Sequence, residues 1–395
     1  MKRKLVMLLT LVVVAAVSGY AQDTNRILQA YRDRFRDASP ETRLQILRTA
    51  DMATVEELGP LYLQAVQSVL SRAAEIPRNV VLRDIALFAV EKIGEGGYTP
   101  ATSALWTLFL EYDDNTARML ILEVLADIGG GDAQLVRDLN GWVQARVNLY
   151  RGGVMPDQQV LRRSARTLGE LGDPSSFPIL LDLRLARISA VISDEANDAM
   201  RGLPGDYADA AVAAVNARGV AERREGLEYF LSEAGLEGDD RARVATRVLA
   251  HAGAEVLRDV TLIEEQRQVR YRAARELMDL SHPQAVEPLI RHFNLTFSDY
   301  ERGMTTRTWV LEAIAALGAT ETERASRRLV ALLDLLNTYT ENDRPYDTQV
   351  MLAVITNLER IGDPQAADAL FYVTMLDYPQ SVRDAARAAL NAVSQ

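Results

Sequence analysis

The chain contains no cysteine among its 395 residues, and this absence removes several kinds of chemistry. Disulfide bonds, thiol catalysis, cysteine zinc sites and a lipid anchor on an N-terminal cysteine are all excluded. The sequence also has little aromatic surface, since Phe, Trp and Tyr make up 6% of it. Apolar burial must therefore rest on Leu, Ala, Val and Ile, which suit thin layers of helix packed on helix.

Positive charge is also scarce, with 44 Lys and Arg against 55 Asp and Glu and a formal net charge of −11. Beyond residue 21, Lys92 is the only lysine. Non-specific nucleic-acid binding needs a basic surface, so no nucleic-acid partner is expected. The same charge disfavours docking onto anionic lipid. A hydrophobic content of 48% argues against intrinsic disorder.

The first residues have the composition of an export signal. A basic segment at 1–4 precedes a run at 5–17 that is apolar apart from Thr10, and small residues follow at Gly19 and Ala21. This pattern predicts a secretory signal, residues 1–21, that is cleaved after Ala21. The apolar run is shorter than the ~20 residues of a membrane span, although an uncleaved anchor is the alternative. We therefore expect an exported chain, soluble in the periplasm, without an integral membrane segment after cleavage.

A helical motif recurs along the chain, most clearly at residues 161–174 and 350–364. Apolar residues recur at helical steps, as at Leu161, Ala165 and Leu168, and so form one face of a helix. Less regular copies of the same helix occur at 82–94, 269–283 and 381–390. Each copy is too thin to bury its apolar face alone, which favours stacking of successive copies.

The clearest copies end in the same three residues, glycine, aspartate and proline. Glycine can take the left-handed conformation that ends a helix, and aspartate can cap the next helix. Proline suits the first position of that next helix, where no N–H is needed. The predicted turn residues are Gly172, Asp173, Pro174, Gly362, Asp363 and Pro364. Each repeat is therefore a helix, a tight turn and a second helix.

Such turns recur at roughly the 40-residue spacing of HEAT-type repeats. No alternating strand pattern persists, so the predicted fold is all-α, an α-solenoid or superhelix of about nine antiparallel helix pairs. We expect residues 22–80 to form an N-terminal cap or first repeat and residues 81–395 to form the array. Within 219–266, Gly235 and Gly253 are both possible turns, so the pairing there stays open.

The run of Val or Leu, then Arg, then Ala, ending in Leu-Gly-Asp-Pro, resembles the bacterial HEAT-like repeats of the phycobilisome-lyase type. The resemblance covers most of residues 80–395 and is most specific at 160–185, 268–294 and 350–395. It departs from the family pattern in the turns, which read Ser-His-Pro at 281–283 and Gly-Ala-Thr at 318–320. The resemblance implies a ladder of arginines paired with acids of neighbouring repeats, formed by Arg83, Arg162, Arg270 and Arg383. It does not imply lyase activity, because no residues match a chromophore site and the export signal predicts another compartment.

Catalytic and metal-binding patterns are missing from the sequence. His251, His282 and His292 do not have the spacing of helical metal ligands, so no metal or cofactor is expected. Asp113-Asp114 and Asp239-Asp240 each open a predicted helix, where capping and the helix dipole explain them. No nucleophile elbow, Walker loop or zinc-protease motif occurs, and we expect no enzyme.

Tyrosine beside charge recurs in the loops between predicted repeats. In a solenoid such loops follow one edge, and tyrosine and arginine dominate many binding sites. The alternative is that each ring packs over the end of its own helix pair and seals the core. The candidate binding residues are Tyr112, Tyr150, Arg151, Tyr300, Arg302, Tyr339, Arg344, Tyr346 and Tyr378.

These features predict a non-catalytic scaffold of the bacterial cell envelope that binds a protein or peptide on a curved helical surface. The alternative is a glycan- or peptidoglycan-binding module, or an envelope enzyme, with a site in the concave groove. Trp106, Trp142 and Trp309 lie in separate repeats without an evident acid pair, which disfavours that alternative. A purely structural spacer is a third possibility.

Overall fold

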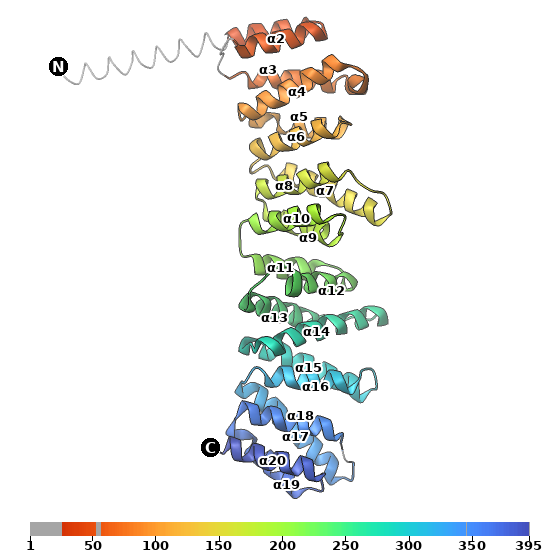
Figure 1. The fold of residues 1–395 in the computed structure, drawn as a ribbon, viewed down its shortest axis with the longest axis vertical. Coiled ribbons are helices and arrows are strands. Elements are labelled where there is room, and N and C mark those ends of the chain that lie inside the picture. Colours follow the sequence, from red (N-terminus) through yellow and green to blue (C-terminus); the bar gives the residue numbers. More distant parts are fainter. Residues whose placement is uncertain (1–25, 53–56, 345, 395) are drawn as a thin grey trace, which may run out of the picture. The chain divides into compact units, whose positions relative to one another are not determined.

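The computed structural model describes residues 26–52, 57–344 and 346–394, and all regular structure in them is helical (Figure 1). The predicted signal at 1–21 lies outside these residues. The chain divides into two compact units, residues 1–204 and residues 205–395. The expected boundaries at residues 21 and 80 stay predictions.

The first unit contains a helical segment at 26–37, followed by nine helices arranged in two rows (Figure 1). The even-numbered helices pack on one another in chain order, and so do the odd-numbered helices. The helices are α2 (Pro40–Met52), α3 (Gly59–Leu70), α4 (Val80–Glu95), α5 (Thr102–Glu111), α6 (Asn115–Ile128), α7 (Ala133–Arg151), α8 (Gln158–Leu171), α9 (Phe177–Leu185) and α10 (Ala190–Gly202).

The second unit repeats this arrangement, again with even- and odd-numbered helices in separate rows. Its helices are α11 (Tyr207–Ala217), α12 (Val220–Glu228), α13 (Gly238–Ala254), α14 (Val260–Leu280), α15 (Val286–Glu301), α16 (Arg307–Gly318), α17 (Glu323–Glu341), α18 (Thr348–Ile361), α19 (Ala367–Met375) and α20 (Gln380–Val393). None of the helices in the described ranges is long and apolar enough to cross a bilayer.

The apolar core of each unit lies between the two rows. Leu161, Ala165 and Leu168 of α8 are fully buried, as the helical period of the sequence predicts. Each unit holds four complete pairs of an even-numbered helix and the following odd-numbered one, and α10 and α11 follow one another along the chain between them. The predicted all-α solenoid of about nine pairs is therefore confirmed for the described residues.

The turns inside the pairs explain why the helices break where they do. Gly172 and Gly362 have positive φ angles of 67° and 68°, which glycine adopts without steric cost. Asp173 accepts a hydrogen bond from the backbone N–H of Ser175 at 2.9 Å. The prolines open short 3₁₀ turns, at Pro174–Ser176 and Pro364–Ala366, that come before α9 and α19.

The structure also pairs the helices of residues 219–266. Gly235, with a φ of 64°, lies in the connection between α12 and α13, which begins with a π-helical turn at Tyr229–Glu233. Gly253 lies inside α13 and has no turn function. The pair is therefore α12 with α13, and the turn is at Gly235.

Candidate functional site

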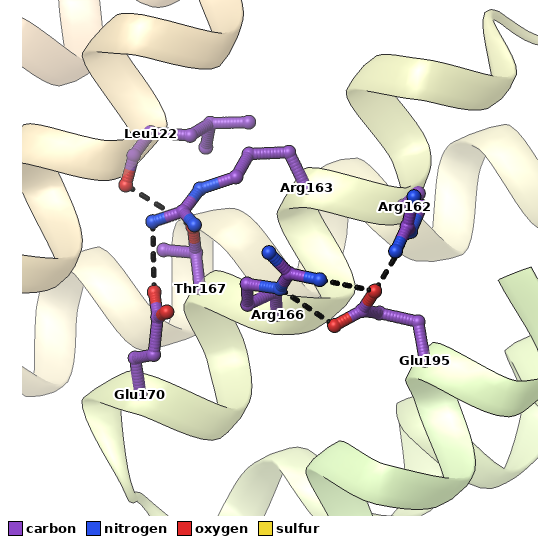
Figure 2. Close-up of polar contacts among 7 residues, drawn as sticks. All are labelled: Leu122, Arg162, Arg163, Arg166, Thr167, Glu170 and Glu195. Carbon is purple, nitrogen blue, oxygen red and sulfur yellow. Dashed lines mark hydrogen bonds and ion pairs between the residues drawn. The ribbon is translucent and has the colours of Figure 1, made fainter.

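Arginine–glutamate pairs join neighbouring helix pairs in the first unit (Figure 2). Arg162 and Arg166 of α8 both bond to Glu195 of α10, at distances of 2.8 and 2.7 Å from their Nε atoms. The hydrogen bond from Arg166 lowers the pKa of the Glu195 carboxyl, whose side chain is 12% exposed. On the other side of α8, Thr167 donates to the backbone oxygen of Leu122 on α6 at 3.1 Å.

The predicted arginine ladder is thus confirmed at Arg162 and is wrong at three other positions. Arg270 is 5% exposed and lies 3.8 Å from Asp299 of its own helix pair, because its position on α14 faces the core. The contact with the neighbouring pair comes instead from Arg272, whose Nε bonds to Glu228 of α12 at 2.6 Å.

Arg83 and Arg383 form no ion pair with any described residue, and Arg383 donates only to Gln380 of its own helix at 3.0 Å. Arginine thus contacts the neighbouring even-numbered helix from α8 and from α14, but not from one fixed position of the repeat. These contacts stabilise the stack and leave the guanidinium groups of Arg162 and Arg166 occupied.

Two of the candidate tyrosines are buried. Tyr112 ends α5 and is 2% exposed, its hydroxyl has no hydrogen-bond partner among the described residues, and burial raises its pKa to about 12. Tyr378 lies between α19 and α20, and its hydroxyl donates to Oδ1 of the buried Asn337 at 3.0 Å. Both rings cover the ends of helix pairs, which favours core packing for these two residues.

Tyr150 lies half-buried in the last turn of α7, beside the exposed Arg151. The loop that follows exposes apolar side chains, with Val154 55% and Met155 60% accessible. A cavity of about 320 Å³ lies there, with Trp142 in its lining. The sequence patterns did not predict this exposed apolar loop. The run Val-Met-Pro before the N-cap of α8 could have indicated it.

The second unit brings three candidate tyrosines together with Phe297, and we call these four residues the tyrosine cluster: Phe297, Tyr300, Tyr339 and Tyr346. The ring centroid of Tyr346 lies 6.1 Å from that of Tyr339 and 6.3 Å from that of Phe297. The hydroxyl of Tyr346 bonds to the carboxylate of Glu301. Burial, Glu301 and the neighbouring tyrosines raise the pKa of Tyr346 well above its ordinary value.

Charged and partly exposed groups surround the tyrosine cluster. Its four rings are all half-buried, and the candidate residues Arg302 and Arg344 are exposed beside them. Asp299, one residue before Tyr300, is bonded to Nε of Arg267 at 2.9 Å. The cluster thus combines flat aromatic surface with two available guanidinium groups, a combination that suits a protein contact.

The remaining polar candidates have structural surroundings. His292 is fully buried, and burial together with the charge of Arg270 lowers its pKa to about 3. Asp114 caps α6 by accepting from the N–H of Ala117 at 2.8 Å, and Asp240 pairs with Arg243 in the first turn of α13. No group of three or more His, Asp or Glu in the described ranges is arranged to hold a metal ion.

Stacked pairs of antiparallel helices, joined by left-handed glycine turns, define this protein as an α-helical repeat protein. Residues 160–183 and 269–294 match the family model of the PBS lyase HEAT-like repeat. These ranges fall on α8–α9 and α14–α15, so two helix pairs of the chain are similar to HEAT-like repeats, at positions that the sequence patterns indicated.

Comparison with solved structures finds distant similarity. A search of curated protein sequences finds no match. One similar solved structure, from work on a phosphorylation switch in the interaction between cadherin and beta-catenin, has 12% identity and a TM-score of 0.33. The match covers 94% of this chain and 96% of that one. Another, a complex of SYS-1 and POP-1, has 10% identity and a TM-score of 0.28, and covers 94% of this chain and 68% of that one.

Proposed function

We propose that this protein is a non-catalytic scaffold that binds a protein or peptide partner outside the cytoplasm, in the bacterial cell envelope. The observation that carries the proposal is the tyrosine cluster with Arg302 and Arg344 at one edge of the second unit. Tyrosine contributes a large, rigid contact area with a polar end, and arginine adds directional hydrogen bonds. Both residue types are enriched among those that dominate binding energy.

The repeat architecture supports the same proposal. Each helix pair adds surface to the stack without changing the core of its neighbours, so residues at the pair edges can vary without loss of the fold. The half-exposed position of Tyr300 and Tyr339 leaves ring surface open to a partner. The envelope location rests on the signal pattern of residues 1–21 alone.

The proposal is tested with the full chain, expressed in a bacterial host with its own N-terminal segment. A photo-crosslinking amino acid placed at Tyr339 should form a discrete protein adduct in the periplasmic fraction. The same amino acid at Ser381, an exposed position on the polar face of α20, is the control and should form none. Recovery of the chain from the cytoplasm alone would contradict the envelope location.

Alanine variants then separate binding from packing. The double variant Y300A/Y339A should lose adduct formation from a probe at Arg344 while its melting temperature changes little. A lower melting temperature with undiminished adduct would show that the rings only seal the core. Adducts with peptidoglycan fragments in place of protein would instead favour the glycan-binding alternative.

A further inference from the structure

A groove lies between α13 and α15 of the second unit, and no residue of the tyrosine cluster lines it. It has a volume of about 350 Å³ and is lined by one residue of α13 and five of α15. Its apolar part is formed by Ala250, Pro288 and Ile290, all partly exposed. Its polar part is formed by Glu287, Arg291 and Asn294, all exposed. We call these six residues the arginine groove.

Arg291 lies across the groove from its own helix toward α13. A Cβ atom built on Gly253 of α13 would lie 3.2 Å from Cδ of Arg291, so the alkyl part of Arg291 rests on the glycine backbone. The absence of a side chain at Gly253 therefore leaves room for this arrangement. It holds the stem of the arginine against protein while the guanidinium stays in solvent.

The guanidinium of Arg291 has no hydrogen bond or ion pair with any described residue, whereas its charged and polar neighbours in the groove are engaged. Glu287 is paired with Arg324 of α17 at 2.9 Å. Asn294 accepts from Nε of Arg328 at 2.8 Å. The groove residues and their two bonded partners thus contain three arginines and one carboxylate, and only Arg324 is paired with that carboxylate. This leaves a local excess of positive charge in an otherwise acidic protein.

The occupant must match both halves of the groove. An apolar side chain can cover Ala250, Pro288 and Ile290, and a carboxylate can form a charge-assisted, bidentate hydrogen bond with the guanidinium of Arg291. A polyanion such as a nucleic acid fits poorly, because Glu287 lies on the rim and the chain as a whole is acidic. A protein segment in which an acidic residue neighbours an apolar one satisfies both requirements.

We propose that the arginine groove binds a segment of a protein partner in which an acidic residue neighbours a leucine or a similar apolar residue. Arg291 pairs with the carboxylate of that acidic residue. The inference rests on the proposed scaffold function and names the chemistry of the partner. None of the six groove residues is among the binding residues predicted from the sequence.

The test measures the fluorescence anisotropy of a labelled peptide of alternating leucine and glutamate titrated with the full chain. The wild type should bind this peptide and should not bind the matched peptide with lysine in place of glutamate. R291A should weaken binding by about tenfold or more, as expected for loss of a hydrogen bond to a charged group. R48A, which removes another exposed arginine, from α2 of the other unit, should leave the affinity unchanged.

A second variant tests the apolar half without a change in charge. A250L should fill the groove beside Ile290 and weaken the binding of the acidic peptide. Circular dichroism should confirm that the helices are intact. Absence of binding by the wild type, equal binding of both peptides, or equal affinity of R291A and R48A would overturn the proposal. Displacement of the peptide by phosphate and acetate alike at low concentration would also overturn it, because the groove would then bind free anions.

The outcome is separable from that of the proposed function. If the peptide does not bind but adducts still form at Tyr339, the proposal that the groove binds an acidic segment is refuted and the proposed scaffold function is kept. Peptide binding without adducts at Tyr339 would refute the tyrosine cluster as the binding edge and keep the groove.

Discussion

Arg166 and Glu195 join helices α8 and α10 through two parallel hydrogen bonds, from Nε to Oε1 at 2.7 Å and from Nη2 to Oε2 at 2.8 Å. Arg162 adds a third bond to the same carboxylate at 2.8 Å (Figure 2). Parallel bonds of this kind fix the rotation of one helix against the next as well as their separation. The contact therefore constrains how α10 packs on α8 in the first unit.

Glu195 is expected to stabilise the fold at neutral pH and to lose this effect in acid. E195Q should lower the free energy of unfolding by about 1 kcal/mol near pH 7, since partly exposed ion pairs contribute modestly. The pKa of Glu195 is lowered in the folded state, so its contribution is present above the ordinary value of 4.5 and fades as pH falls through the lowered pKa. Urea unfolding of E195Q and wild type from neutral pH to below pH 4 measures the difference. E123Q, an exposed position on α6, is the control, and an equal loss in both variants would contradict the assignment.

Replacement of two helical glycines by alanine should change the stability of the protein in opposite directions. A Cβ on Gly169 of α8 would lie 3.0 Å from Cα and Cβ of Ala199 on α10, closer than most Cβ contacts in packed proteins. G169A should therefore destabilise the protein by about 1–3 kcal/mol through overpacking. Gly141 of α7 has open space at the same place, so G141A should stabilise by roughly 0.5–1 kcal/mol through helix propensity. Thermal unfolding of both variants decides the matter, and a destabilised G141A would show that propensity does not govern this site.

Replacement of the two buried tyrosines by phenylalanine allows a second comparison of stability. Y378F removes the donor that bonds to Asn337, leaves a buried acceptor unsatisfied, and should cost about 1–3 kcal/mol. Y112F removes a buried hydroxyl that has no partner among the described residues, so it should be neutral or stabilising by up to about 1 kcal/mol. Chemical denaturation of the two single variants tests this contrast. Equal losses would contradict it, because both rings are kept and the two hydroxyls would then contribute alike.

His292 should make the fold sensitive to mild acid. Its pKa is lowered from 6.5 to about 3 in the folded state, so the unfolded chain binds a proton in this interval and the folded chain does not. Stability from this group is therefore present above pH 6.5 and falls by about 1.4 kcal/mol per pH unit as pH drops below that value.

The comparison of H292L with wild type isolates this effect. Between pH 6.5 and 5 the carboxylates titrate little, and H292L should show a flatter dependence of the unfolding free energy on pH. H251Q, on the exposed face of α13, should keep the slope of the wild type. Parallel curves for H292L and wild type would show that His292 takes up its proton equally in both states.

The repeat pattern predicts the fold well because it depends on short-range chemistry. Leu161 and Leu168 fall on one helical face, and the glycine turns adopt left-handed angles that follow from the residue alone. The pairing in 219–266 could not be chosen, since either glycine was compatible with the local pattern. Only the packing of α12 against α14 and of α13 against α15 selected Gly235.

The candidate site was predictable only in part. The sequence indicated tyrosines near pair ends but could not separate the buried Tyr112 and Tyr378 from the half-exposed Tyr300 and Tyr339, because burial depends on neighbouring helices. It named Arg270 for a contact that Arg272 makes, since helix rotation within the stack decides which position faces the next pair.

The sequence by itself determined the helices, their turns and the need to stack, because periodicity, glycine conformation and apolar composition act within one or two repeats. Tertiary structure alone decided which arginine meets which carboxylate, which tyrosines stay accessible, and that Arg291 remains unpaired beside an apolar groove. These features depend on the rotation and spacing of helices that are some 30 to 45 residues apart, as are Arg162 and Glu195 or Tyr346 and Glu301.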